Sequence, residues 1–333
     1  MTKAHHPRRG SLGYSPRKKV ASPVPKIRSW PNINEVKILG FSGYKAGMTH
    51  VVIIDDRKNS ISSGEEITRA VTVIETPPLA IFGVRLYGRN TYGLHVLDEF
   101  WVKELAKQFS RAVLVPKKNE KSIEDLESLL DETVEVRALV HTQPWLTGIG
   151  QKKPEIMEYS VSGNVKEAFE LVKNKLGGTV SIGDIFQDGE YVDFMGITKG
   201  KGFQGTLKRW GTKHLSRKTR NGRRTAGNLG PTTPAAMMWR VPQSGQMGYH
   251  HRTEYNKRIL NIVTSDNLIN ITPKGGFLNY GIVKNDYIVV DGSIAGPRKH
   301  LVRFRQGIRK KGTGKTVKKP EINYISLESK QGV

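Results

Sequence analysis

The chain has 333 residues, with 54 Lys and Arg against 30 Asp and Glu, a net charge of +24 at pH 7. It contains no cysteine, which excludes disulfides, cysteine nucleophiles and thiolate metal sites. The N-terminal residues lack the apolar core of a secretory signal, and no apolar run approaches the ~18 residues of a membrane span. We therefore expect a cytoplasmic protein without a membrane segment.

The positive charge is concentrated in three segments. Residues 1–34 contain eight Lys and Arg, residues 194–253 contain twelve and residues 292–320 contain ten, and none of the three contains an Asp or Glu. The rest of the chain carries 24 bases and all 30 acids, a net of −6. Like charges repel unless a polyanion lies beside them. The distribution therefore favours nucleic acid as the partner over a membrane surface or an acidic protein.

The first elements in chain order are an extended arm and a group of strands. Residues 1–34 are rich in Pro, Gly, Ser and Arg and lack periodicity, so we expect them to be disordered in the isolated protein. The following β-branched runs are bounded by Gly or Pro and predict strands. These runs are residues 36–56, 67–78, 79–88 and 91–100.

Helical spacing of apolar residues begins near residue 98. It predicts helices over residues 98–110, 121–132 and 163–178. The last of these has Asn164 and Glu167 in a capping-box pattern and the Gly177–Gly178 pair at its end. Strands are predicted over residues 133–143 and 155–161. Together these elements indicate an α/β unit inserted into a β protein.

The remaining predicted elements are strands interrupted by the long acid-free segment. They comprise residues 179–186, 190–197, 257–263, 267–273, 275–283, 286–294 and 299–306. Their composition matches that of the strands before the insertion. A single barrel or sandwich built from both sets is therefore expected.

Two glycine-rich motifs resemble nucleotide-binding loops but lack the residues that such loops need. "GKGFQG", residues 200–205, matches G-x-G-x-x-G, yet no acid follows it until Glu254 to hold a ribose hydroxyl. "KKGTGKT", residues 310–316, has Arg309 where a P-loop would have its first glycine. We interpret the first as a site of close backbone approach and the second as a flexible basic loop.

The sequence contains two histidine pairs but no pattern typical of a metal site or a catalytic site. His5–His6 and His250–His251 have no nearby carboxylate or cysteine set to complete a metal site. No nucleophile, base and acid are placed together by the sequence. We therefore expect no catalytic activity, no metal and no cofactor.

The composition of residues 199–224 is typical of RNA binding. Ten Lys and Arg alternate there with Gly, Thr and Ser and with two aromatic residues, Phe203 and Trp210. Cations and hydroxyls bind phosphates, while aromatic rings stack on unpaired bases. No recognition helix or zinc finger is visible, so folded RNA is favoured over a DNA duplex.

Several long blocks carry a family resemblance. "PRRGSLGYSPRKK", "GYKAGMTHVV", "DFMGITKGKGFQGTLKRWGTKHLSRKTRNGRR" and "SGQMGYHHRTEYNKRI" are collinear with the family of large-subunit ribosomal protein "L three". The chain resembles its archaeal and eukaryotic form, and the absence of cysteine and of a long C-terminal tail favours the archaeal one. It departs from eukaryotic relatives at Thr232–Thr233–Pro234, where they have "WHP". Methylation of that histidine is therefore not expected here.

The resemblance implies a mainly β fold with an α/β insertion, in the form of a translation-protein-like β-barrel with an extended basic arm and a long central loop. It also implies that the loop tip approaches the peptidyl transferase centre, where Trp239 of "MMWRV" occupies the matching position. The alternative for Trp239 is packing back onto the barrel. The implied organisation is an arm (1–34), barrel strands (35–78), the insertion (79–178), further barrel strands with a basic C-terminal loop (179–198 and 259–333) and the central extension (199–258).

We therefore expect a non-catalytic, structural component of the large ribosomal subunit that binds 23S ribosomal RNA, contacts neighbouring ribosomal proteins and supports early subunit assembly. A free-standing RNA chaperone or assembly factor is the alternative. The expected RNA-binding residues are Arg8, Arg9, Arg17, Lys18, Lys19, Lys199, Lys201, Phe203, Lys208, Arg209, Trp210, Lys213, His214, Arg217, Lys218, Arg220, Arg223, Arg224, Trp239, Arg240, Gln246, Tyr249, His250, His251, Arg252, Arg298, Lys299, Arg303 and Arg305.

Overall fold

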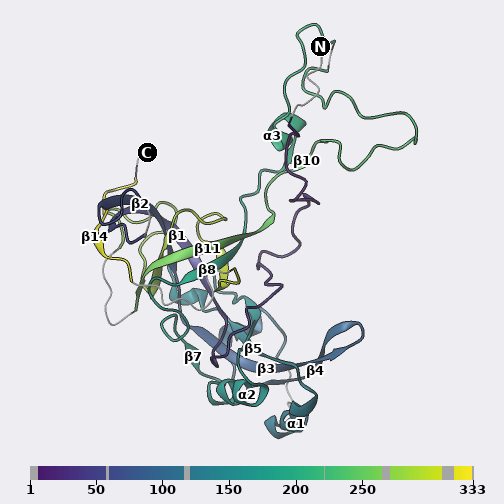
Figure 1. The fold of residues 1–333 in the computed structure, drawn as a ribbon. Coiled ribbons are helices and arrows are strands. Elements are labelled where there is room, and N and C mark those ends of the chain that lie inside the picture. The colour runs from purple at the N-terminus through teal and green to yellow at the C-terminus, as the bar shows by residue number, and fades with distance from the viewer. Residues whose placement is uncertain are drawn as a thin grey trace. The chain divides into compact units, whose positions relative to one another are not determined.

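The computed structural model of the chain describes residues 7–57, 60–115, 121–220, 222–264, 271–309 and 319–331 (Figure 1). It is mainly β, as the sequence predicts. Two compact units make up the chain. Met1–Pro23 with Ile197–Arg252 form one, which we call the cationic unit, and Val24–Gly196 with Thr253–Val333 form the other, which we call the β unit.

The larger sheet of the β unit closes on itself. Its strand order is β13-β8-β11-β12-β2-β1-β14, and β13 also pairs with β1, so the described strands from β1 to β13 form a ring. The strands are β1 (Gly40–Ile54), β2 (Glu66–Glu75), β8 (Tyr191–Ile197), β11 (His251–Val263), β12 (Tyr287–Asp291), β13 (Leu301–Gln306) and β14 (Ile322–Ile325). Closure leaves β14 as the strand with a free edge, which limits edge-to-edge association.

The second sheet comes from one continuous stretch of chain. Its order is β4-β3-β5-β6, with β7 paired to β3. The strands are β3 (Leu79–Asn90), β4 (Gly93–Trp101), β5 (Glu135–His141), β6 (Ile156–Ser160) and β7 (Thr179–Val180). Helix α2 (Val165–Asn174) packs on β5 and β3 through Ala168, Phe169 and Val172, which recur at helical spacing on one face.

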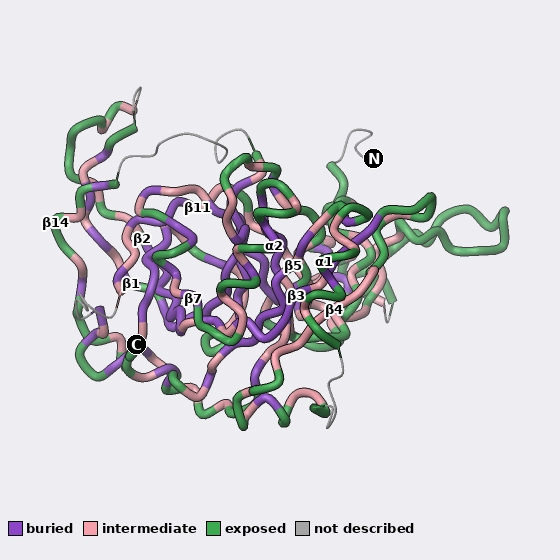
Figure 2. The backbone as a smooth tube through the Cα atoms, turned by 90° about the horizontal axis from the view of Figure 1, so that it is seen from below, coloured by how far each residue is buried: buried purple, intermediate pink, exposed green. Residues whose placement is uncertain are grey.

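Short helical turns complete this second part of the β unit. They are α1 (Ile123–Glu127) and the 3₁₀ turns η1 (Lys107–Arg111), η2 (Leu130–Glu132) and η3 (Pro144–Leu146). Buried residues lie mainly on the strands of both sheets, although β4 and β14 contain none, and exposed residues dominate the connecting loops (Figure 2). One apolar core continues across both sheets, from Phe41 and Phe304 of the ring to Tyr159 and Phe169.

The cationic unit has little regular structure. It contains β9 (Phe203–Gln204), paired with β10 (Gly245–Gln246), and the five-residue helix α3 (Thr206–Trp210). Gly211, with a φ of +68°, ends α3 in the left-handed conformation. The described residues of the arm in this unit, 7–23, contain neither helix nor strand. Residues 24–34 belong instead to the β unit, where Val24, Ile27 and Trp30 pack against its core.

Three local predictions are wrong because tertiary contacts override sequence pattern. Residues 98–101 end strand β4, and only η1 forms from the predicted helix over 98–110. Trp101 packs edge-on against Phe82, with ring centroids 5.3 Å apart, which favours strand over helix. Residues 275–283 form turns rather than a strand. In the predicted strand over 179–186, only Thr179–Val180 is a strand.

Helix capping also differs from the predicted pattern. Asn164 is the N-cap of α2, but its side chain makes no capping hydrogen bond. The capping box occurs at Ser122 and Asp125 of α1 instead. Strand β14 was not predicted. Residues 265–270 lie outside the described residues, so most of the predicted strand over 267–273 is not tested.

Arg303 connects three parts of the β unit. The side chain is 5% exposed and donates hydrogen bonds to the carbonyl oxygens of Pro25 (3.0 Å) and Glu158 (2.6 Å). Its guanidinium also lies 4.7 Å from the ring centroid of Tyr159. The residue therefore joins the second part of the arm, residues 24–34, to the ring and to the second sheet.

Arg305, on the same strand as Arg303, forms a buried ion pair. It lies directly opposite Asp193 across strands β13 and β8, with 3.3 Å between Nη2 and the carboxylate. Neither side chain is more than 5% exposed. Arg305 also donates to the carbonyl oxygen and hydroxyl of Ser29. Both arginines are thus hydrogen bonded within the protein, although the sequence pattern assigned them to RNA.

We predict that Arg305→Met destabilises the β unit by about 3–5 kcal/mol, because Asp193 would remain charged and buried without its partner. Urea unfolding followed by far-ultraviolet circular dichroism measures the change. Arg298→Met, at an exposed position, is the control and should change stability by less than about 0.5 kcal/mol. Equal stability of the two variants would show that the Arg305–Asp193 pair contributes little.

Candidate nucleic-acid interface

The cationic unit contains no carboxylate side chain. Met1–Pro23 holds six Lys and Arg, Ile197–Arg252 holds twelve, and neither has an Asp or Glu. Within the unit, guanidinium and ammonium groups therefore have no carboxylate as a partner. The contacts of each basic side chain show which ones support the unit and which remain available to a ligand.

Arg209 supports the unit from within. Its Nε donates to the carbonyl of Gln246 (2.9 Å), Nη1 to that of Gln243 (2.9 Å) and Nη2 to that of Arg17 (3.1 Å). Each of its three nitrogen atoms is thus hydrogen bonded to backbone. Arg209 joins the arm to the returning strand of the extension, and it is not free to meet a phosphate with its fork.

Trp210 forms the small core of the cationic unit. It is 8% exposed, and its Nε1 donates to the carbonyl of Gln243 (2.8 Å). The guanidinium of Arg17 lies 3.9 Å from its ring centroid, close enough for a cation–π interaction. Gly10 approaches the ring so closely that a Cβ there would lie 2.5 Å from Cε3. We refer to Trp210, Arg209 and Arg17 as the clasp.

Trp239 has the opposite environment. It is 70% exposed, beside Met237 and Met238, which are 49% and 46% exposed. Every residue from 231 to 240 is exposed. Trp239 therefore does not pack in the core of its own unit. The two tryptophans of the extension have similar sequence surroundings, and only their contacts distinguish them.

The arm lies along the last residues of the extension. Val20 N–H donates to the carbonyl of Tyr249 (3.1 Å), and His250 Nδ1 donates to that of Lys18 (2.9 Å). The guanidinium of Arg252 lies 4.7 Å from the ring centroid of Tyr14. These contacts bring two cationic segments together although more than 200 residues separate them in sequence.

The predicted RNA-binding residues fall into three groups by exposure. Exposed ones are Arg8, Arg9, Lys18, Lys19, Lys199, Lys201, Phe203, Lys208, Lys213, His214, Arg217, Lys218, Arg220, Arg223, Arg224, Trp239, Arg240, Arg298 and Lys299. Partly buried ones are Arg17, Arg209, Gln246, Tyr249, His251 and Arg252. Buried ones are Trp210, His250, Arg303 and Arg305.

Sequence reasoning missed the acceptors that hold the clasp. Gln243 accepts hydrogen bonds from Arg209 and Trp210 through its backbone carbonyl, and Gly10 leaves room for the Trp210 ring. A backbone acceptor has no residue-type signature. The positive φ of Gly10, +73°, is a conformation that favours glycine, but one glycine among 35 carries little signal on its own.

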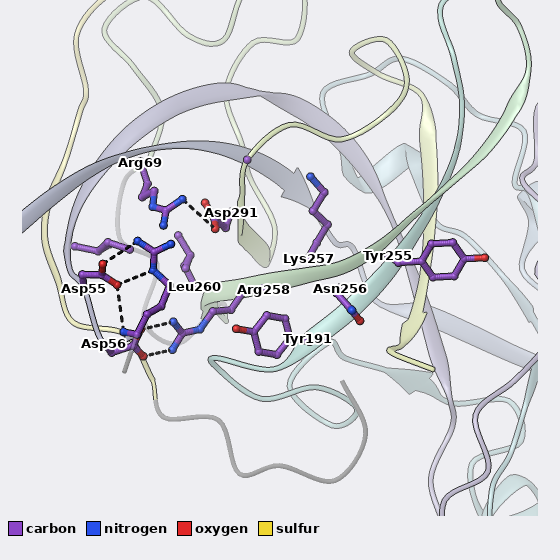
Figure 3. Close-up of a pocket in the computed structure, with 13 residues that line it drawn as sticks. Asp55, Asp56, Arg69, Tyr191, Tyr255, Asn256, Lys257, Arg258, Leu260 and Asp291 are labelled. Atoms are coloured by element: carbon purple, nitrogen blue, oxygen red, sulfur yellow. Dashed lines mark hydrogen bonds and ion pairs between the residues drawn. The ribbon is translucent and has the colours of Figure 1, made fainter. Parts of the chain in front are cut away.

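A cavity of about 330 Å³ in the β unit is lined by carboxylates and arginines (Figure 3). Arg57 hydrogen bonds to Asp55 through two nitrogens and holds the pKa of that carboxyl well below its usual range. Arg258 does the same to Asp56 and lowers its pKa. Carboxylates that are ionised and paired in this way cannot serve as general acids.

The described parts of the candidate nucleotide and metal motifs do not have the geometry of such binding sites. In "GKGFQG", Phe203–Gln204 forms β9 and Gly205 is the N-cap of the five-residue helix α3. Among the described residues, no group of three or more His, Asp or Glu is arranged to hold a metal ion. "KKGTGKT" and His5–His6 lie outside the described residues. No helix within the described ranges is long and apolar enough to cross a membrane.

Comparison with known proteins gives a match along the whole chain. A family model described as "Ribosomal protein L3" matches residues 1–332. A "Large ribosomal subunit protein uL3" of Methanothrix thermoacetophila is 48% identical over 338 residues, covering 100% of both chains. Proteins with the same description from Methanocaldococcus jannaschii and Archaeoglobus fulgidus are also 48% identical, covering 98% and 99% of both chains respectively.

We predict that Trp210→Ala loosens the arm. It removes a hydrogen bond and a cation–π contact, together worth about 2 kcal/mol, so the Val20 amide should exchange roughly thirtyfold faster. Hydrogen exchange with mass spectrometry on the free protein measures this. Trp239→Ala is the matched control and should leave exchange of the arm unchanged. Equal effects of both variants would exclude a special role for Trp210.

Proposed function

The chain belongs to the ribosomal protein L3 family, and from that premise we propose that its cationic unit binds large-subunit ribosomal RNA. Membership makes the chain a structural constituent of the large ribosomal subunit rather than an enzyme. The proposal concerns how this constituent is attached. It places the main RNA contact on the arm and the extension, and it places the chain on ribosomes in the cytoplasm.

The observation that carries the proposal is the charge of the cationic unit. Its eighteen Lys and Arg are accompanied by no Asp or Glu, and most of their side chains are exposed. Internal pairing cannot neutralise this charge, so a polyanion is the ligand that the unit fits. RNA phosphates accept hydrogen bonds from ammonium and guanidinium groups, and each contact releases condensed counterions.

The shape of the segments favours RNA over a DNA duplex. The described part of the cationic unit has one helix, α3, and its five residues are too few to read a major groove. Exposed aromatic side chains occur at Phe203 (75%) and Trp239 (70%). Such rings stack on unpaired bases, which folded RNA presents and a duplex does not.

We further propose that the tip carrying Trp239 approaches the peptidyl transferase centre. The exposure of every residue from 231 to 240 supports this, because the tip packs little against its own unit and is accessible to RNA. The matching position of Trp239 in the family supports it as well. If the arm and the extension are both anchored in folded RNA, the protein can support early subunit assembly and contact neighbouring ribosomal proteins.

A free-standing RNA chaperone or assembly factor is the alternative. Such a factor would bind RNA transiently and would leave the finished subunit. Sedimentation of large subunits after a high-salt wash separates the two functions. The proposed constituent should remain in stoichiometric amount with the RNA, whereas loss into the supernatant would favour the alternative.

We predict a steep salt dependence of RNA binding. If about half of the eighteen basic residues contact phosphates, the log–log slope of affinity against salt concentration should be about −8. Filter binding to large-subunit ribosomal RNA between low and moderate potassium chloride concentrations measures the slope. A slope near about −2 would mean that most of these charges face solvent in the complex.

We predict that Trp239→Ala leaves the protein folded and incorporated but alters the RNA near the peptidyl transferase centre. Loss of one stacked ring removes about 1–3 kcal/mol of local contact, while the basic residues continue to anchor the chain. Chemical probing of RNA in mutant subunits reads the local change, and thermal unfolding of the free protein reads stability. Unchanged probing together with a large loss of stability would contradict the assignment.

A further inference from the structure

A second cavity lies wholly within the cationic unit. Its volume is about 410 Å³. Side chains from the arm, from the segment after β8, from α3 and from the start of β11 line it. The polar ones are Arg17, Thr198, Lys199, Lys201, Arg209, His250 and Arg252. No carboxylate lines the cavity, and none exists anywhere in the unit.

The cavity is held in shape by backbone contacts. Gly248 has a φ of +71°, and its Cα approaches the carbonyl of Lys199 so closely that no Cβ fits. Lys201 N–H donates to the carbonyl of Met247 (2.9 Å). The two walls that carry Lys199 and His250 are therefore fixed to each other before any ligand arrives.

Several donors in the cavity lack a partner within the protein. The Nε of Arg17 is buried without a hydrogen bond. Lys199 and Lys201 are exposed and make no side-chain hydrogen bond or ion pair with any described residue. By contrast, Arg209 is hydrogen bonded to carbonyls through all three nitrogens. The cavity therefore combines a wall that these hydrogen bonds hold in place with two lysines whose side chains have no partner among the described residues.

The charges around Arg17 are not compensated. Burial, followed by the positive charges of Arg209, Arg252 and Arg8, lowers the pKa of Arg17. Such mutual repulsion costs free energy in the empty unit, and an anion placed between the cations would relieve it.

His250 adds a titratable group to this wall. Because its Nδ1 donates to the carbonyl of Lys18, Nε2 is the remaining polar atom of the ring. Burial lowers the pKa of His250, and the cations of Arg252, Arg209 and Arg17 lower it further, against the opposing effect of the Lys18 carbonyl. The ring is therefore neutral at pH 7 in the free protein.

We propose that this cavity binds one phosphate group of the RNA backbone, held by Lys199 and Lys201 beside the unpartnered Nε of Arg17. The proposal rests on the proposed function and names a particular contact within it. The single negative charge of the bound phosphodiester would stabilise the imidazolium of His250, whose Nε2–H then donates to a phosphate oxygen. Phosphate binding is therefore coupled to uptake of one proton.

The sign of the coupling follows from the two states of His250. In the free protein its pKa lies below the ordinary value, and beside a phosphate it rises. Between these two pKa values binding takes up a proton, so affinity increases as pH falls, by up to about tenfold per pH unit. Above both values the coupling disappears.

The first experiment uses sulfate, an oxyanion whose charge does not change near neutral pH. The nuclear magnetic resonance signal of His250 in the full chain is titrated with pH, with and without sulfate. We expect sulfate to raise the pKa of His250. Lys201→Met should weaken the sulfate response by about tenfold, the scale of one lost charge-assisted hydrogen bond, whereas the control Lys152→Met, at an exposed position of the β unit, should retain it.

The second experiment uses large-subunit ribosomal RNA transcribed in vitro. Its affinity for the wild type, for His250→Gln and for the control His95→Gln, an exposed histidine of the β unit, is measured by filter binding from pH 5.5 to 8.5, a range of about three units around the ordinary histidine pKa. Wild type and His95→Gln should bind more tightly as pH falls, and His250→Gln should lose that dependence.

The outcomes separate this proposal from the proposed function. RNA binding without any His250-dependent pH effect, together with a His250 signal that ignores sulfate, would overturn the phosphate site and leave RNA binding intact. A sulfate response without the RNA effect would overturn the assignment to RNA and leave a site for free anions. Failure of RNA to bind any variant would contradict the proposed function itself.

Discussion

The absence of carboxylates from the cationic unit determines how that unit is built and what it can bind. The β unit pairs Arg305 with Asp193 and Arg258 with Asp56. The cationic unit instead holds the partly buried guanidinium groups of Arg17 and Arg209 with carbonyl oxygens and the indole ring of Trp210. Neutral acceptors orient a cation but do not cancel its charge. The unit therefore reaches a defined arrangement around Trp210 while its net charge stays intact, and that uncancelled charge is available to a polyanion.

The absence of carboxylates also means that tryptophans and arginines have two different roles in this protein. Some hold the fold together, and others are exposed to a ligand. Arg209 and Trp210 fasten the arm to the extension from inside, whereas Trp239 is exposed at 70% in a segment without buried residues. Arg303 and Arg305 extend the same division to the β unit, since both are buried and connect residues 24–34 of the arm to the sheets. A basic residue in such a protein is thus assigned to RNA by its contacts and not by its charge alone.

Much of the fold was predictable, because β-branched runs between Gly and Pro mark most strands and the apolar spacing marks α2. The segment 98–110 was not, since pairing of Phe100 and Trp101 with β3 overrides its helical spacing. The location of the cationic segments followed from charge. The different roles of Trp210 and Trp239 could not be predicted from charge, because a backbone acceptor such as the Gln243 carbonyl does not depend on residue type. Arg305 carried a weak signal, an arginine within an apolar strand, whose partner Asp193 becomes evident only from the cross-strand register.

The cationic unit is proposed to carry the main contact with ribosomal RNA. Mapping of lysine acetylation in free protein and in purified large subunits tests it most directly. Lys18, Lys199, Lys201, Lys208 and Lys213 are exposed in the cationic unit, and Lys103, Lys107, Lys152 and Lys166 are exposed in the β unit. In large subunits the lysines of the cationic unit should become at least tenfold less reactive, which corresponds to about 1.4 kcal/mol of protection. Most of the lysines of the β unit should stay reactive. Unchanged reactivity of the lysines of the cationic unit in intact subunits would contradict the proposal.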